Sequence, residues 1–200
     1  MHSDVEERYS RRAPEYIETL GSMSAVHPAD AHLVTDWAGR LAGPVIDAGC
    51  GPGQWTSHLA ARGVRIRGVD QVRRFIDHAR RTHPGVLFEL GDLTELPDPS
   101  GGVAGVLAWY SLIHQEPSVL RESLTEFARV LCPGGGLLVG FFTGPRIEQF
   151  DHAVASAYRW PVEAMSSELI DAGFEVVEAH TRTGAGYRPH GAILARRAPG

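Results

Sequence analysis

The chain has 200 residues, of which 43% are hydrophobic, and a formal net charge of −5 with histidine counted as neutral. This length suits one domain with a sizeable core, and the interspersed charges argue against a nucleic-acid partner, which usually needs a basic surface. No apolar run approaches the roughly 18–20 residues that cross a bilayer, and the charged N-terminal segment lacks the apolar region of a signal peptide. We therefore expect a cytoplasmic protein that does not associate with membranes.

The residue types that are rare or missing exclude several classes of site and reaction. The two cysteines, Cys50 and Cys132, do not have the spacing of a metal site, so no metal is expected. All 19 basic residues are arginine, and neither lysine nor asparagine occurs. A Schiff-base enzyme or a P-loop phosphate binder would lack its essential amine. Together with abundant alanine, glycine and arginine, these absences indicate a GC-rich bacterial genome.

Two helical patterns open the chain, at residues 3–20 and 28–42. Strand and helix patterns then alternate. Strands are expected at 45–49, 65–70, 86–91, 103–109 and 137–142, and helices at 54–62, 72–82 and 117–131. Short apolar strands that alternate with helices predict an α/β fold with a mainly parallel, doubly wound sheet.

The last part of the chain changes character. A helix is expected at 161–172, beginning at Pro161 and ending at Gly173. Two strand-like runs follow, at 174–181 and 190–197, and a Gly/Pro-containing loop separates them. These two runs could pair as antiparallel strands.

The most informative segment is VIDAGCGPG, Val45 to Gly53. A strand that ends in glycines and leads into a helix brings bare backbone close to a ligand and aims N–H groups at it. The dinucleotide-binding fingerprint requires G-x-G-x-x-G after the strand. Counted from Gly49, the sixth position is Gln54, and a count from Gly51 fails as well. The pattern present is D-x-G-x-G-x-G.

This pattern resembles the first motif of the class I S-adenosylmethionine-dependent methyltransferases. The resemblance covers about residues 40–197 and implies a single domain, 1–200, with a Rossmann-like, seven-stranded sheet that ends in a C-terminal antiparallel hairpin. Residues 1–43 would be N-terminal capping helices, 44–142 the cofactor-binding core, and 143–200 the substrate-side segment with the hairpin. S-adenosyl-L-methionine is the implied cofactor, and S-adenosyl-L-homocysteine its product.

Acidic residues follow the next two strands where the family places them. Asp70 would accept hydrogen bonds from the ribose hydroxyls, and Asp92 would accept one from the adenine amine. Each has a simpler interpretation, since aspartate commonly caps helices and forms turns, and Asp47 could hold the glycine loop instead of touching the cofactor. The resemblance assigns to the cofactor site Tyr9, Tyr16, Asp47, Gly49, Cys50, Gly51, Gln54, Trp55, Asp70, Gln71, Val72, Gly91, Asp92, Leu93, Trp109, Tyr110, Ser111 and His114.

The end of the fourth strand excludes several reaction classes. The segment from Trp109 to Leu112 contains no proline, unlike the [DNS]-P-P-[YFW] motif of enzymes that methylate nucleobase amines. Trp109 stands where metal-dependent catechol-type enzymes carry aspartate, and no asparagine exists to complete a hard-cation site. The paired glutamates of protein arginine methyltransferases are also missing, because Glu116 stands alone.

His114 is the first candidate for a general base, since an imidazole with a pKa of about 6.5 suits proton removal at neutral pH. His152 is the second candidate. Two alternatives stay open for His114: it could be a helix-entry or cofactor-contacting residue, and relatives also work by proximity alone.

Aromatic and arginine side chains dominate the segment after the fifth strand and the loop before the last one. The candidate substrate-binding residues are Phe142, Arg146, Tyr158, Arg159 and His190. We expect methyl transfer to an oxygen or nitrogen of a small molecule, by a monomer or a homodimer. A family member that catalyses another reaction, a non-catalytic partner subunit and a nicotinamide-dependent oxidoreductase are the alternatives.

Overall fold

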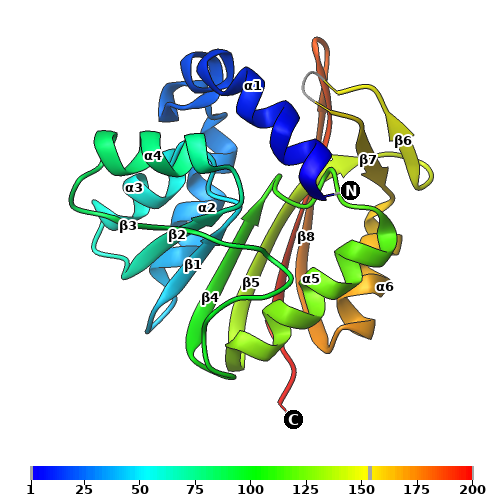
Figure 1. Cartoon of the computed structure of the whole chain (residues 1–200). Helices are drawn as coiled ribbons and strands as arrows, with labels where there is room; N and C mark the ends of the chain where they lie inside the picture. The colour runs from blue at the N-terminus through cyan, green and yellow to red at the C-terminus, as the bar shows by residue number, and fades with distance from the viewer. Residues whose placement is uncertain (1, 153–154, 200) are drawn as a thin grey trace.

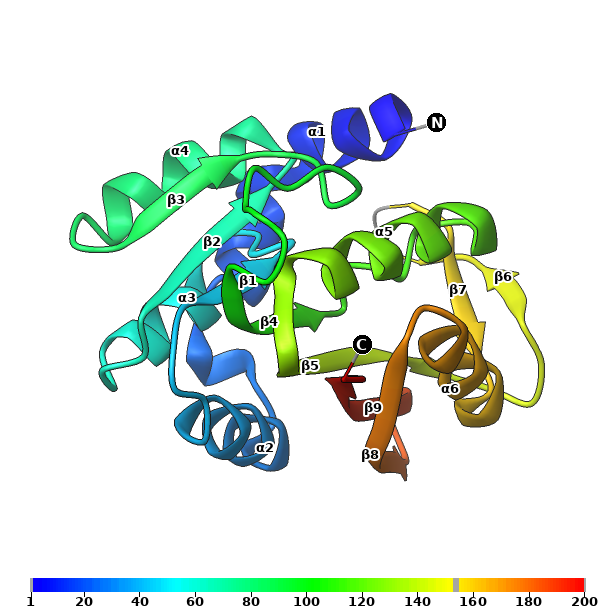
Figure 2. The same ribbon diagram turned by 90° about the horizontal axis from the view of Figure 1, so that it is seen from below.

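The structure is a computed structural model that describes residues 2–152 and 155–199. One twisted sheet runs through the molecule, with helices on both of its faces (Figures 1 and 2). The helices are α1 (His2–Leu20), α2 (Pro28–Gly39), α3 (Gln54–Ala60), α4 (Arg73–Thr82), α5 (Pro117–Val130) and α6 (Val162–Asp171), with a short 3₁₀ turn at Met23–Ala25. The strands are β1 (Val45–Ala48), β2 (Ile66–Asp70), β3 (Leu87–Leu90), β4 (Val103–Trp109), β5 (Leu131–Thr143), β6 (Glu148–Phe150), β7 (Ala157–Trp160), β8 (Phe174–Gly184) and β9 (Tyr187–Arg197).

The sheet confirms the expected α/β topology. Strands β3, β2, β1, β4 and β5 lie side by side in that order, and each neighbouring pair is parallel. Strand β9 pairs antiparallel with β5 and with β8, which makes the C-terminal hairpin. The order reverses between β1 and β4, and in such sheets ligands bind at the carboxyl ends of the strands beside this switch point.

Side chains of successive residues along the central strands point to opposite faces of the sheet, and this divides the core into two layers. Val106 and Ala108 of β4 pack with α5 and α6 on one face. Leu107, which lies between them, packs with α2 and α3 on the other face. Burial on both faces explains why these strands read as continuous apolar runs.

The number of strands differs from the expectation, because the sheet of the described residues has nine strands and not seven. The two additional strands are β6 and β7, which pair antiparallel within the segment after β5. Both are only three or four residues long and mix polar with aromatic side chains, so they lack the alternation that marks a strand. Residues 1, 153–154 and 200 of the expected 1–200 domain lie outside the described residues.

Helix boundaries differ by one to three residues from those expected, as is usual for frayed ends. No helix in the described part of the chain is both long enough and apolar enough to span a membrane.

Candidate functional site

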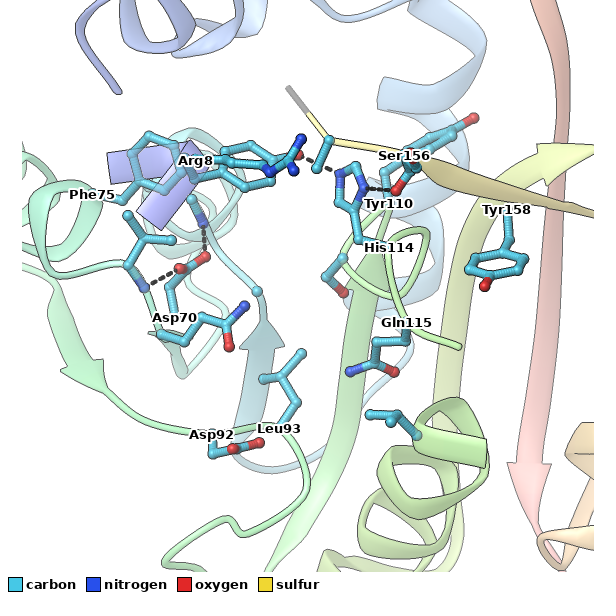
Figure 3. A pocket seen from close by; sticks show the side chains of 18 of the residues that line it. Arg8, Asp70, Phe75, Asp92, Leu93, Tyr110, His114, Gln115, Ser156 and Tyr158 are labelled. Carbon is cyan, nitrogen blue, oxygen red and sulfur yellow. Dashed lines mark hydrogen bonds between the residues drawn. The ribbon is translucent and has the colours of Figure 1, made fainter. Parts of the chain in front are cut away.

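A cavity of about 360 Å³ opens at the carboxyl ends of β1, β2 and β4, and α1 forms part of its wall (Figure 3). This volume lies near the lower end of the range of about 300–1,000 Å³ that is usual for small-molecule sites. Fourteen of the residues proposed from the sequence line it: Tyr9, Tyr16, Gly49, Gly51, Asp70, Gln71, Val72, Asp92, Leu93, Trp109, Tyr110, Ser111, His114 and Tyr158.

The glycine loop between β1 and α3 forms one wall with bare backbone. Gly49 has φ +77° and Gly51 has φ +53°, conformations that favour glycine. A Cβ atom on Gly49 would lie 2.2 Å from Cβ of Ser111, so only glycine lets β1 and the end of β4 approach this closely. The Ser111 hydroxyl is buried and has no hydrogen-bond partner among the described residues, and it is therefore available to a ligand.

Asp70 ties the ends of two strands together. Its Oδ2 accepts a hydrogen bond from the Gly51 N–H at 2.8 Å, and its Oδ1 accepts one from the Val72 N–H at 2.8 Å. The carboxylate thus fixes the glycine loop beside the end of β2 (Figure 3). Asp70 also lines the cavity, so its carboxylate lies where a ligand could contact it.

Asp92 lies after β3, on the same side of the cavity as Asp70 (Figure 3). Its Oδ1 accepts hydrogen bonds from the N–H of Thr94 at 2.9 Å and from the Thr94 hydroxyl at 2.8 Å. These contacts are typical of an aspartate that holds its own turn. The turn also places Leu93 in the cavity wall.

Asp47 lies behind the glycine loop and does not line the cavity. Its side chain is 2% exposed, and its Oδ2 accepts a hydrogen bond from the Thr56 hydroxyl at 2.6 Å. Burial raises the pKa of this carboxyl to about 7, and the Thr56 hydrogen bond opposes that rise. The sequence left open whether Asp47 touches the cofactor or holds the glycine loop. Its position behind the loop favours the second role.

The N-terminal helix contributes an aromatic wall. Tyr9 and Tyr16 of α1 face Phe75 of α4, with ring centroids 5.8 and 5.3 Å from that of Phe75. Burial raises the pKa of both tyrosines, that of Tyr16 to about 12, and the negative charge of Asp70 adds to the effect. Both phenols therefore stay protonated at neutral pH and can donate hydrogen bonds.

His114 faces the cavity from the loop between β4 and α5. Its Nδ1 lies 2.8 Å from the carbonyl oxygen of Ser156 (Figure 3). Its Nε2 lies 2.7 Å from the Tyr9 hydroxyl. A carbonyl oxygen can only accept, so Nδ1 carries the proton in the neutral ring. Nε2 therefore accepts from Tyr9. Burial lowers the pKa of His114, and the hydrogen bond to Ser156 partly offsets this.

His152, the second candidate base, does not line the cavity, although its ring centroid is 5.3 Å from that of His114. Burial, followed by the charges of His114 and Arg188, lowers the pKa of His152 to about 4. A conjugate acid this strong makes the imidazole a weak base at neutral pH. The geometry therefore favours His114.

Tyr110 directly follows β4 and has φ +58°, an uncommon conformation for a residue with a side chain. Its hydroxyl hydrogen-bonds to Nδ1 of His190, and its ring lies 5.1 Å from that of Phe142. His190 lines a second, neighbouring cavity between α2 and the β8–β9 hairpin, whose walls also include Trp109 and Tyr110.

Several other proposed residues do not line this cavity. Cys50 and Trp55 are buried in the core, Gln54 begins α3, and Gly91 connects to Asp70 through a backbone hydrogen bond of 3.1 Å. The remaining ones are Phe142, Arg146 and Arg159, and the last two pair with Glu148. Their roles stay predictions.

Eight lining residues were not expected from the sequence: Arg8, Phe75, Gln115, Glu116, Val119, Gln149, Ala155 and Ser156. Gln115 and Glu116 adjoin His114, so their position in the chain could have suggested them. The other six come from helices or from the segment around β6 and β7, where no motif marks them. Among the described residues, no group of three or more His, Cys, Asp or Glu side chains could hold a metal ion.

Known proteins resemble this chain in sequence and fold. A family described as a methyltransferase domain matches residues 45–135. A malonyl-[acyl-carrier protein] O-methyltransferase of Salmonella typhimurium is 34% identical over 135 residues, which are 68% of this chain and 51% of that protein. A trans-aconitate 2-methyltransferase of Methylobacterium nodulans is 40% identical over 107 residues, 50% of this chain and 39% of that protein.

Among solved structures, a Burkholderia thailandensis 1,6-didemethyltoxoflavin-N1-methyltransferase superposes with a TM-score of 0.82 at 22% identity. The match covers 99% of this chain and 89% of that one, which was crystallised with 1,6-didemethyltoxoflavin and S-adenosylhomocysteine. This likeness shows a shared fold. The chain spans about half the length, or less, of these two curated relatives.

Proposed function

The chain belongs to the class I S-adenosylmethionine-dependent methyltransferases, and from this premise we propose that it transfers a methyl group from S-adenosylmethionine to an oxygen or nitrogen of a small molecule. One observation carries the proposal. The carboxylate that ends β2 is hydrogen-bonded to the glycine loop that ends β1, and both face the same cavity as Asp92. Bare backbone and two carboxylates thus surround one cavity near the switch point of the sheet.

The residues present fit this cofactor. Asp70 would accept hydrogen bonds from the two ribose hydroxyls, and Asp92 with Leu93 would meet the adenine. The close approach of Gly49 to Ser111 leaves backbone, and a buried hydroxyl without a partner among the described residues, for the polar groups of the methionine part. Tyr9 and Tyr16 would cover the bound cofactor from α1 until the acceptor enters.

When bound, the cofactor supplies a methyl group on a positively charged sulfur, which makes that carbon open to displacement. The protein then has to align the acceptor and remove its proton. His114 is placed for proton removal, because its tautomer is fixed by Ser156 and its Nε2 is an acceptor at the cavity wall. Gln115, Gln149 and Tyr158 would contact the acceptor.

We further propose that the enzyme works in the cytoplasm, as a monomer or homodimer, without a nucleic-acid partner. The acidic net charge of −5 supports the last point. The names of the curated relatives, which give malonyl-[acyl-carrier protein] and trans-aconitate as acceptors, support an enzyme that methylates metabolites.

The test is transfer of a labelled methyl group. The protein is incubated with methyl-labelled S-adenosylmethionine and a small-molecule extract of a GC-rich bacterium. We expect S-adenosylhomocysteine and a labelled product in equal amounts, and a loss of both in an Asp70→Ala variant. A converted but unlabelled product would instead show another reaction, and binding of the cofactor without turnover in any extract would indicate a non-catalytic partner.

A further inference from the structure

The hydrogen bond between Tyr9 and His114 has a defined direction. Because Nδ1 of His114 donates to the Ser156 carbonyl, Nε2 carries the lone pair and the Tyr9 hydroxyl is the donor. A phenol O–H therefore points at the same nitrogen that a general base would offer to its substrate. The two residues are 105 positions apart in the chain and meet only at this cavity.

The surroundings of this hydroxyl are those of a site for an aromatic ring. The Tyr9 ring lies edge-on to His114, Tyr16 and Phe75, with centroids 5.3, 5.5 and 5.8 Å away. Edge-to-face contacts at these distances are favourable. A planar ring that replaced Tyr9 would therefore find the same neighbours and the same hydrogen-bond acceptor.

We propose that the methyl acceptor is an aromatic alcohol whose hydroxyl takes the place of the Tyr9 hydroxyl at Nε2 of His114. This inference rests on the proposed function and names its substrate class. The N-terminal part of α1 would withdraw Tyr9 as the acceptor enters. The acceptor proton then moves from its oxygen to Nε2, and the imidazolium keeps its Nδ1–H bond to the Ser156 carbonyl.

The same geometry disfavours other acceptors. A carboxylate would turn a lone pair toward the lone pair of Nε2, which is repulsive, and needs no base because it is already ionised. An alkyl alcohol is a far weaker acid than a phenol, whose pKa is about 10, and is harder for an imidazole to deprotonate. A phenol satisfies Nε2 as a donor and gives up its proton more readily.

The test uses 4-nitrophenol, whose absorption reports both binding and loss of its proton, added to the protein saturated with S-adenosylhomocysteine. We expect Tyr9→Phe to bind the probe at least fivefold more tightly than the unmodified protein, because the competing hydrogen bond is gone. His114→Gln in the Tyr9→Phe background should remove that gain. Tyr187→Phe is the control: it removes another hydrogen-bonded phenol hydroxyl, which donates to the Thr183 carbonyl in the β8–β9 hairpin outside the cavity, and it should change the affinity less than twofold.

Equal affinity of Tyr9→Phe and the unmodified protein would overturn the inference, as would a gain that persists without His114 or a probe that binds none of the proteins. Calorimetric titration of S-adenosylhomocysteine into the same samples separates this failure from a failure of the proposed function. If the cofactor product binds and the probe does not, only the acceptor class is wrong. If the cofactor product itself does not bind, the proposed function fails.

Discussion

At the scale of single residues, the proposed chemistry depends on one imidazole, that of His114, whose protonation is fixed by its neighbours. The Ser156 carbonyl holds the proton of His114 on Nδ1, and burial lowers the pKa of the ring. His114 is therefore neutral at physiological pH, with a basic nitrogen at the cavity wall. His152 lies beside it but has a pKa of about 4 and no place in the wall.

Replacing His114 with glutamine should lower turnover roughly 100-fold, the usual contribution of a general base. Because burial depresses the pKa of His114 below its ordinary value of 6.5, the base stays available as the pH falls and is lost only as the pH drops through that lower pKa. The pH profile of kcat/KM should thus decline on the acid side below pH 6.5, and this decline should disappear in the variant. His152→Gln is the matched control, and an unchanged acid limb in His114→Gln would exclude His114 as the base.

At the scale of elements, the glycine loop between β1 and α3 shapes the part of the cavity proposed to hold the cofactor. Gly51 combines three roles: it has φ +53°, its N–H donates to Asp70, and it lines the cavity. A Cβ atom there would meet no protein atom within 4 Å, so it would occupy open space at the cavity wall.

Gly51→Ala should therefore weaken binding of S-adenosylhomocysteine at least tenfold. Gly63→Ala is a close control, because Gly63 also has a positive φ of +85°, no atom would lie within 4 Å of its Cβ, and it does not line the cavity. Both variants should lose about 1–2 kcal/mol of unfolding free energy from the strained backbone, measured by denaturant unfolding. Equal affinities of the two variants in calorimetry would show that the loop does not approach the ligand.

The elements differ in how well they could be predicted from the sequence. Most of residues 45–142 was predictable because β1, β2 and β4 are short apolar runs followed by helices, and because Gly49, Asp70 and Asp92 each end or follow a strand. The carboxyl ends of neighbouring parallel strands meet at one edge, so local patterns were enough to assemble this half of the site.

The part of the cavity proposed to hold the methyl acceptor, around Tyr9, His114 and Ser156, could not be predicted in the same way. The Tyr9–His114 hydrogen bond joins residues 105 positions apart, and the Ser156 carbonyl comes from a segment whose strands are too short for a periodic signal. Backbone acceptors such as this carbonyl carry no residue signature. Arg146 and Arg159 were proposed from composition alone, and the structure pairs both with Glu148 instead of placing them in the cavity wall.

At the scale of the whole molecule, Asp47 couples the stability of the fold to pH. Its pKa is about 7 in the folded protein, against about 3.9 in an unfolded chain. Between these values the folded state binds more protons than the unfolded state, so this group lowers the unfolding free energy as the pH rises. The cause is burial under the glycine loop, at the centre of the sheet.

Asp47→Asn keeps an oxygen for Thr56 and removes the charge. The unfolding free energy of the variant relative to the unmodified protein should therefore increase by more than about 1 kcal/mol from pH 4.5 to pH 7.5, since one pKa unit corresponds to about 1.4 kcal/mol. Urea denaturation at both pH values measures this. The comparison also cancels the opposite contribution of His152, whose pKa is lowered in the folded protein. A difference that does not change with pH would mean that Asp47 stays ionised when buried.

The sheet brings the ends of three strands to one cavity, and the proposed function depends on what that cavity binds. Calorimetric titration of S-adenosylhomocysteine into the unmodified protein and into Asp70→Ala, with NAD as a second ligand, tests this most directly. We expect one molecule of S-adenosylhomocysteine to bind per chain, at least tenfold more weakly in the variant, and no heat from NAD. The proposed function would be contradicted if S-adenosylhomocysteine did not bind the folded protein, or if it bound Asp70→Ala with equal affinity.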